Sequence, residues 1–258
     1  MTKDLVVLYS SFSDFQDVLP ITHHFYRKHC SALPFEVFWG SNGHGIQCFE
    51  TIAPDWHLLQ GSDEDLGWSG NLKSYLEQIK SEYVLLILDD FIFLKPPCLK
   101  EILEGFFLMK EEGAVYLRLR DRPGPDKPLS GGFGVIPYYS DHRASLQPAI
   151  WKKEFLLELC EYNFNQWEFE IKAGVVKLAI DQQFLGSISD LMNARHCITK
   201  GMWIPHMLKL IEQEGLEISD RAVMSPKQKS AIGMTKNAEK SRLINRIHPK
   251  SSSMREKF

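Results

Sequence analysis

The chain has 258 residues, of which 44% are hydrophobic and 24% are charged, and its formal net charge is −3. These fractions are typical of a folded globular protein and exclude a disordered or membrane-embedded chain. A chain of this length forms one large α/β domain or two small domains.

The five cysteines are an odd number and form no CxxC pair, which argues against a disulfide framework or a zinc site. The first residues enter a strand-like segment without a basic region and a long apolar stretch, so no signal peptide is predicted. The most apolar run, 83–88, is far shorter than a membrane span. We therefore expect a cytoplasmic protein.

Short apolar segments alternate along the chain with segments of helical spacing. Strands are predicted at 4–9, 35–40, 49–52, 83–88 and 114–119. Helices are predicted at 17–30, 71–80, 99–109, 151–162 and 205–214. Residues 120–134 are predicted to form a long loop, residues 131–134 a hinge within it, and residues 163–170 a turn.

This alternation predicts an α/β fold with a mostly parallel central sheet and helices on both faces. We expect one main domain over 1–220. Ligands of such sheets bind beyond the carboxyl ends of the strands. That edge carries candidate ligand contacts, which include Ser10, Ser11, Asp89 and Asp90.

The acidic pair Asp89-Asp90 follows the apolar strand 83–88 directly. Carboxylates in this position can hold a divalent cation that bridges a diphosphate, or can accept hydrogen bonds from a sugar. The alternative is that both residues only cap the following turn.

Two later segments combine carboxylates, amides and aromatic rings. Glu168 and Glu170 flank Phe169, and either carboxylate could act as the base that deprotonates a sugar hydroxyl. Gln147 could bond sugar hydroxyls and Trp151 could stack on a sugar, although Trp151 could equally belong to the core.

Trp68 and Ser69 precede a predicted helix and are interpreted either as nucleotide contacts or as a helix start. His196 and His206 are isolated histidines, and a lone histidine is more often a hydrogen-bonded structural residue than a metal ligand.

The segments 88–91, 67–72, 145–151 and 167–170 together resemble GT-A-fold glycosyltransferases, in particular bacterial enzymes that build surface polysaccharides such as lipopolysaccharide, capsule and O-antigen. The resemblance covers about residues 1–215 in separated blocks. It implies a GT-A-like, Rossmann-like fold with a catalytic domain over 1–220. The nucleotide-sugar donor would bind the half at 1–100, and a glycan or lipid-linked acceptor would bind the half at 101–220.

The resemblance also implies that the base lies at the start of a helix, which favours Glu168, and that the sugar is transferred with inversion. Metal-dependent members often have a further metal contact downstream of the base, which makes His196 a candidate ligand together with Asp90.

The chain departs from the family's DxD motif because Leu88 occupies the first carboxylate position. Asp90 could still bind Mg²⁺ or Mn²⁺ with the diphosphate. Alternatively no metal binds, and basic residues such as Arg118, Arg120, Arg122 and Lys127 stabilise the leaving group.

Two other functions remain open. A sugar-phosphate nucleotidyltransferase would share the strand order, but the loop after the first strand, 9–14, lacks the glycines of its phosphate loop. A non-catalytic binding protein of the same fold is the other alternative, supported by the missing first carboxylate.

The C-terminal segment 221–258 carries ten Lys and Arg residues against two acidic residues. Its best amphipathic stretch, 238–247, could lie on an anionic membrane surface, or the tail could be a solvated extension. No nucleic-acid partner is expected.

Overall fold

The computed structural model describes residues 4–43, 46 and 48–228. Within these residues the chain divides into two compact units, the first ending at His196 and the second beginning at Cys197. The division falls before residue 220, where the sequence suggested the end of the catalytic domain. The two halves expected within that domain share one sheet, which takes strands from both. None of the described helices is both long and apolar enough to cross a membrane.

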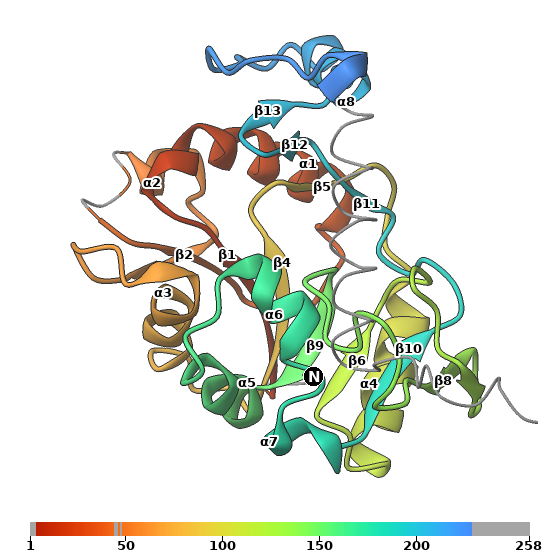
Figure 1. Cartoon of the computed structure of the whole chain (residues 1–258). Helices are drawn as coiled ribbons and strands as arrows, with labels where there is room; N and C mark the ends of the chain where they lie inside the picture. The colour runs from red at the N-terminus through yellow and green to blue at the C-terminus, as the bar shows by residue number, and fades with distance from the viewer. Residues whose placement is uncertain (1–3, 44–45, 47, 229–258) are drawn as a thin grey trace, which may run out of the picture. The chain divides into compact units, whose positions relative to one another are not determined.

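A nine-stranded sheet forms the centre of the first unit, in the order β3-β2-β1-β4-β9-β6-β10-β8-β7 (Figure 1). Its strands are β1 (Leu5–Ser10), β2 (Val37–Ser41), β3 (His57–Gln60), β4 (Tyr83–Leu88), β6 (Tyr116–Arg118), β7 (Lys127–Pro128), β8 (Phe133–Val135), β9 (Ala149–Lys152) and β10 (Phe184–Ser187). β3, β2, β1 and β4 are parallel neighbours, whereas β9 runs antiparallel between β4 and β6. The sheet is mostly parallel, as predicted.

Helices cover both faces of this sheet. The helical segments of the first unit are η1 (Ser13–Val18), α1 (Leu19–Cys30), α2 (Phe49–Ile52), α3 (Gly67–Leu76), α4 (Leu99–Glu111), α5 (Lys153–Cys160), α6 (Gln166–Lys172) and α7 (Lys177–Ile180). Apolar side chains of α1 and α4 join one core cluster, and those of α3, α5 and α6 join a second cluster.

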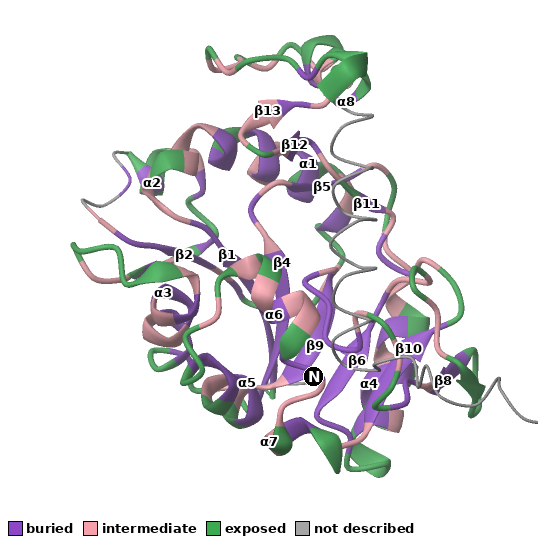
Figure 2. Cartoon of the chain, in the orientation of Figure 1, coloured by how far each residue is buried: buried purple, intermediate pink, exposed green. Residues whose placement is uncertain are grey.

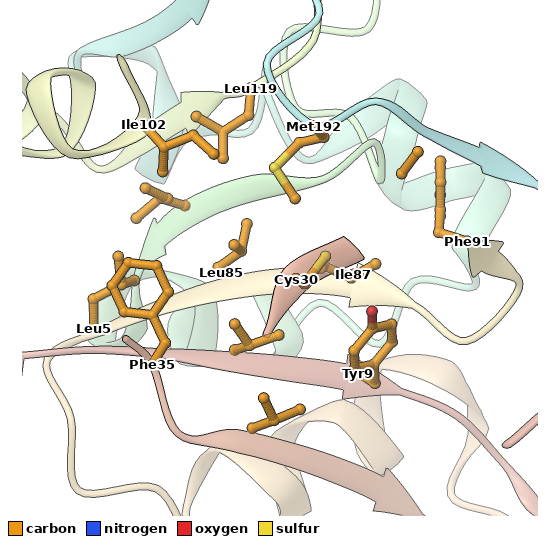
Figure 3. Packing of buried hydrophobic residues seen from close by; sticks show 14 of the residues in the cluster. Leu5, Tyr9, Cys30, Phe35, Leu85, Ile87, Phe91, Ile102, Leu119 and Met192 are labelled. Carbon is orange, nitrogen blue, oxygen red and sulfur yellow. The ribbon is translucent and has the colours of Figure 1, made fainter. Parts of the chain in front are cut away.

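The alternation of β1 and β4 explains the two core clusters. Leu5, Val7 and Tyr9 of β1 face the α1 and α4 side, while Val6 and Leu8 face the α3 and α5 side. Figure 2 shows the central strands as buried, and Figure 3 shows Leu85 and Ile87 of β4 packed with Tyr9 in the first cluster. Full burial of each such side chain contributes about 1.5–3 kcal/mol, so the acidic pair follows a strand that is stabilised by burial on both faces.

Four local predictions are corrected by the structure. Residues 49–52 form one helical turn instead of a strand, because Phe49 and Ile52 are spaced to lie on one side of a helix; the third strand is β3. Trp151 lies in β9, and the helix predicted at 151–162 begins only at Lys153. The predicted turn at 163–170 contains the start of α6. The predicted loop 120–134 contains the short β7–β8 hairpin, so residues 131–134 belong to its turn and second strand.

The first unit also contains a separate, two-stranded antiparallel sheet. It pairs β5 (Phe91–Phe93) with β11 (Ala194–His196), so that Phe91 is opposite His196. β5 begins immediately after Asp90, and this pairing therefore connects the end of the first unit to the acidic pair.

The second unit contains the antiparallel pair β12 (Ile198–Thr199) and β13 (Met202–Trp203), followed by α8 (Pro205–Gln213). Pro205 begins α8, and Gly215, with a φ of +71°, follows its end, as the sequence predicted. Trp203 is fully buried, and its indole Nε1 donates to the carbonyl oxygen of Ser219 at 3.3 Å. Most of the basic tail, including the amphipathic stretch 238–247, lies outside the described residues.

Candidate active site

The carboxyl ends of β1, β2 and β4 meet at one edge of the sheet. Ser10 is paired with Gly40 of β2 and with Leu88 of β4. Beyond these pairs, the amide of Asp89 donates to the carbonyl oxygen of Ser10 at 3.3 Å, and the amide of Ser11 donates to that of Gly40 at 2.9 Å. The prediction that these strand ends share an edge is confirmed.

Asp89 is a buried carboxylate that connects β1 with β4. It is 6% exposed, and its Oδ2 accepts a hydrogen bond from Ser11 Oγ at 2.7 Å. Thr22 Oγ1 of α1 donates to the Asp89 carbonyl oxygen at 2.8 Å, and Tyr75 OH of α3 donates to the Ser11 carbonyl oxygen at 3.1 Å. Burial, followed by the charge of Asp89, raises the pKa of Tyr75, so its hydroxyl remains a donor. Asp89 therefore holds the edge together.

Asp90 is bound differently from its neighbour. Its Oδ2 lies 2.9 Å from His196 Nδ1, and its side chain is 14% exposed. Its Oδ1 is buried and has no hydrogen-bond partner among the described residues. Buried carboxylate oxygens are normally satisfied, so this one requires a partner from outside the chain, such as a water, an ion or a ligand.

His196 reaches Asp90 through the β5–β11 pairing. Its ring centroid is 3.8 Å from that of Phe91, which fixes the plane of the imidazole against the residue that follows Asp90. The histidine side chain is 35% exposed, so part of the ring remains accessible. The structure thus brings together the two residues that the sequence singled out as candidate metal ligands.

The residue set fits a cation that is shared with a substrate. Among the described residues there is no group of three or more His, Cys, Asp or Glu side chains that could hold a metal ion. Mg²⁺ in phosphate-transfer sites is often bound by only one or two carboxylates, the remaining ligands being waters and phosphate oxygens. Asp90 Oδ1 provides such a ligand position.

The segment before β9 lies at the same edge. Antiparallel pairing sets Ala149 opposite Leu86, so residues 145–148 extend beyond the carboxyl end of β4. Gln147, predicted to bond sugar hydroxyls, accepts a hydrogen bond through its Oε1 from Arg120 Nη1. Gln147 therefore connects this segment to Arg120, which follows β6.

The two candidate bases have different contacts. Glu168 completes a capping box at the start of α6: its amide donates to Asn165 Oδ1 at 3.0 Å, and its Oε2 accepts from the Asn165 amide at 3.3 Å. Its Oε1 binds Lys172 Nζ at 2.6 Å, and this bond, followed by the Asn165 amide, lowers the pKa of Glu168.

Glu170 is instead connected to the segment at the sheet edge. Its Oε1 accepts from the Leu146 amide at 3.1 Å and from Ser145 Oγ at 3.4 Å. The carboxylate is thus held beside Gln147, while Glu168 is held on its own helix.

Three other residues predicted to contact a ligand, Trp151, Ser69 and Trp68, instead contact other residues of the protein. Trp151 is fully buried, with its ring centroid 4.4 Å from that of Tyr116 and 5.7 Å from that of Phe169, so it is a core residue. Ser69 is also fully buried and donates to the Phe164 carbonyl oxygen at 2.6 Å, which joins α3 to the start of α6. Trp68 packs edge-on against Phe169, with the two ring centroids 4.9 Å apart.

Two residues at this site were not predicted from the sequence, namely Asp190 and Arg195. Asp190 Oδ2 binds Arg195 Nη1 at 2.5 Å and lies 3.6 Å from Arg120 Nε. Their segment has no strong periodicity, and its only sequence signal is the concentration of polar residues shortly before His196. The other predicted basic candidates lie elsewhere: Arg118 is fully buried, and Lys127 and Arg122 are exposed.

No known family profile matches the sequence, and no curated protein matches it significantly. Among solved structures, S. aureus TarS is similar over 99% of this chain and 46% of its own, with 17% identity and a TM-score of 0.52. TarS 1-349 in complex with UDP has 14% identity and a TM-score of 0.51, over 97% of this chain and 73% of its own.

A CMP:2-keto-3-deoxy-manno-octonic acid synthetase complexed with CTP is similar at 10% identity and a TM-score of 0.50. That match covers 82% of this chain and 100% of the synthetase. The chain spans less than half the length of the longer TarS structure. At these identities the comparisons establish a shared fold, the mixed α/β fold that the sequence predicted.

Proposed function

We propose that the chain is a nucleotide-sugar-dependent glycosyltransferase whose donor binds at the carboxyl edge of β1, β2 and β4. The observation that carries the proposal is the half-buried Asp90 carboxylate, which has one oxygen on His196 and a buried second oxygen without a partner among the described residues. Burying a carboxylate oxygen without a hydrogen bond costs free energy that a ligand would offset. The fold shared with TarS, crystallised with UDP, supports a nucleotide as that ligand.

In the proposed reaction an acceptor hydroxyl attacks the anomeric carbon of the sugar. The new bond joins the acceptor oxygen to that carbon, the bond from the carbon to the diphosphate oxygen breaks, and the bonding electrons leave with the diphosphate. A carboxylate takes the proton of the hydroxyl. This single displacement inverts the configuration of the sugar.

Glu170 is the better of the two candidate bases. Both oxygens of Glu168 are bound, to Lys172 and to the Asn165 amide, and its lowered pKa makes it a weaker proton acceptor. All the hydrogen bonds described for the Glu170 carboxylate are made at Oε1. The sequence resemblance favoured Glu168 because it begins a helix, a position that in this structure serves the capping box.

Asp90 Oδ1 would hold a divalent cation, with His196 as a second candidate ligand beside it. Such a cation, when bound, supplies charge neutralisation to a departing diphosphate. Both side chains are positioned by the protein itself, through β4 and the β5–β11 pairing, so their arrangement does not depend on the ion.

Nucleotidyl transfer is the second candidate because the synthetase crystallised with CTP has the same fold. The loop that follows β1 reads Ser11-Phe12-Ser13-Asp14 and contains no glycine. A phosphate-binding loop needs backbone amides that approach the phosphates closely, which glycine permits. Glycosyl transfer is therefore favoured, and a binding protein without turnover is the third candidate.

The acceptor is proposed to be a glycan or a lipid-linked sugar of bacterial surface polysaccharide synthesis. The basic tail would bring the enzyme to an anionic membrane at the inner face of the plasma membrane. Replacing Lys236, Lys240, Arg242 and Arg246 with Gln should weaken binding to vesicles that contain anionic lipid. Equal vesicle binding by this variant and the parent protein would remove the membrane from the proposal.

The decisive experiment incubates the protein with individual nucleotide sugars and nucleoside triphosphates, with and without Mn²⁺. Slow release of free nucleoside diphosphate from a nucleotide sugar supports the glycosyltransferase, whereas pyrophosphate release from a triphosphate supports the nucleotidyltransferase. The matched control is Asp4→Asn, which alters a half-exposed carboxylate paired with Lys110 beside the opposite end of β1. Nucleotide binding without any turnover would favour the binding protein.

A further inference from the structure

Arg120 is half-buried and differs from Arg118 and Arg143, the two arginines that are buried in the described part of the first unit. Arg118 is fully buried, and its guanidinium donates to the carbonyl oxygens of Pro123, His142 and Arg143 and to Tyr116 OH. Arg143 donates to the carbonyl oxygens of Gly174 at 2.9 Å, Ala179 at 2.7 Å, Gln182 at 2.6 Å and Ile136 at 3.3 Å. Both side chains fix loops by saturating backbone carbonyls.

Arg120 has far fewer acceptors. Its side chain is 12% exposed, its Nη1 donates to Gln147, and its Nε is buried without a hydrogen-bond partner in the described part of the chain. A guanidinium carries five N–H donors. Burial lowers the pKa of Arg120, which reflects the cost of keeping a charge away from water. Nε is therefore one donor of a largely desolvated cation that no described residue accepts and that a ligand can satisfy.

The position of Arg120 is fixed by two residues. Asp190 Oδ1 accepts from the amides of Met192 at 3.2 Å and Asn193 at 3.1 Å, which orients its other oxygen. That oxygen binds Arg195 Nη1 at 2.5 Å and lies 3.6 Å from Arg120 Nε. One carboxylate thus serves two guanidinium groups, and this group of three side chains has an excess positive charge. Gln147, which lies just before β9, accepts a hydrogen bond from Arg120 and helps to fix its position.

The cation lies on the same edge of the sheet as Asp90. β6 and β4 run in the same direction, since both are antiparallel to β9, and Arg120 follows β6 as Asp90 follows β4. The Phe91 ring connects them: its centroid is 3.8 Å from the His196 ring and 6.0 Å from the Arg120 guanidinium carbon. Within residues 4–43, 46 and 48–228, Asp90 Oδ1 is an acceptor without a donor and Arg120 Nε is a donor without a hydrogen-bond acceptor, and these two atoms do not satisfy each other.

We infer that Arg120, assisted by Arg195, binds the diphosphate of the sugar donor, and that Gln147 and Asp190 are its positioning residues. A sugar diphosphate has phosphate oxygens for the guanidinium groups. It also brings Asp90 either the divalent cation that it carries or, in the absence of metal, a sugar hydroxyl, so one ligand satisfies both groups. This inference rests on the proposed function for the identity of the donor. The shared chemistry, a diphosphate on a planar guanidinium, can be tested without knowing the nucleotide.

The experiment measures binding of inorganic pyrophosphate to the full chain by calorimetry without added metal, and then binding of UDP, GDP, CDP and dTDP. The variants are Arg120→Gln, Arg120→Lys and Asp190→Asn. Arg27→Gln is the matched control, because Arg27 is an exposed arginine on α1 that also pairs with an aspartate, Asp55, at 3.1 Å. Circular dichroism and the melting temperature check that each variant is folded.

The inference expects Arg120→Gln to weaken pyrophosphate binding by roughly tenfold or more, since a hydrogen bond to a charged group contributes about 1.5–3 kcal/mol. Arg120→Lys should recover part of the affinity because it keeps the charge but loses the planar fork. Asp190→Asn should weaken binding less, and Arg27→Gln should not change it.

The outcomes separate the inference from the proposed function. Pyrophosphate binding that depends on Arg120, with no binding of any nucleotide, would retain the anion site and overturn the nucleotide-sugar proposal. Nucleotide binding that is unchanged in folded Arg120→Gln and Arg120→Lys would overturn the role of Arg120 and leave the proposed function standing. Absence of pyrophosphate and nucleotide binding in the parent protein would overturn both.

Discussion

His196 Nδ1 lies 2.9 Å from Asp90 Oδ2, although 106 positions separate the two residues in the sequence. The contact depends on a three-residue strand pairing that sets His196 opposite Phe91. It leaves the second Asp90 oxygen buried and unpaired in the part of the chain that the structure covers. The β5–β11 pairing therefore holds His196 against one oxygen of Asp90, while the other oxygen of Asp90 is left without a partner among the described residues.

The first prediction concerns the separate roles of the two aspartates. Asp90→Asn should reduce turnover of the nucleotide sugar by about a hundredfold or more, the scale on which a single electrostatic contact to the reacting groups contributes. It should leave the free energy of unfolding nearly unchanged, because asparagine keeps the shape of the side chain and its contact with His196 while the buried Oδ1 no longer carries part of a charge. Asp89→Ala should lower the free energy of unfolding by about 1–3 kcal/mol, because Ser11 loses its acceptor. Urea denaturation and initial rates measure both effects. Loss of stability without loss of turnover in Asp90→Asn would contradict the assignment.

The second prediction distinguishes the candidate bases. Glu170→Gln should reduce kcat by about 10²–10⁴-fold with little change in KM, since general base catalysis contributes on that scale. Glu168→Gln should retain most of kcat and lower the melting temperature slightly, because it weakens the capping box and the bond to Lys172. NMR of the product should show an inverted anomeric centre. Retention of configuration would argue against a single displacement and hence against either glutamate as its base.

The third prediction concerns Arg143, which donates to four backbone carbonyls and lies 4.1 Å from the centroid of the Phe184 ring. Burial lowers the pKa of Arg143 to about 10, so the cation is still charged at neutral pH. Arg143→Ala should lower the free energy of unfolding by roughly 3 kcal/mol, because it leaves buried carbonyl oxygens unsatisfied. Equilibrium denaturation measures the loss. A change below about 0.5 kcal/mol, the range of ordinary surface substitutions, would show that water replaces the guanidinium without cost.

The fourth prediction is a loss of stability at alkaline pH. Burial, with Glu161 as a lesser cause, raises the pKa of Cys160 to about 12. An unfolded thiol has a pKa of about 8.5, so the folded state binds the proton more tightly between these values. The stabilisation is complete below pH 8.5 and is lost as the pH rises toward 12, at about 1.4 kcal/mol per pH unit for this thiol.

Denaturation curves between pH 8 and pH 11 test this slope, with Cys160→Ala as the comparison. The variant should be less stable at pH 8 but should show a shallower decline with pH. Cys48, an exposed cysteine, serves as the control through Cys48→Ala, which should leave the slope unchanged. Parallel declines for the parent protein and Cys160→Ala would refute the assignment of the slope to this thiol.

The sequence by itself determined the sheet edge and the place of the acidic pair on it. Six consecutive apolar residues, 83–88, can be buried on both faces only as a central strand, and the polar residues that follow must then leave the sheet at its carboxyl end. The helices at 17–30 and 99–109 could also be predicted from the local pattern, because their apolar residues recur at helical spacing over several turns.

Only the tertiary structure decided which of these polar residues act together. The strand 194–196 is too short to show a period, so only the family resemblance placed His196 with Asp90, and nothing in the sequence assigned Asp190 to Arg120. The same limit applies to Trp151, whose place in β9 is set by strands on both sides, and to Glu168, whose oxygens are taken by its own helix. Periodicity reports the contacts that a residue makes with its neighbours in sequence, whereas the chemistry of this site depends on contacts between strand ends that are far apart along the chain.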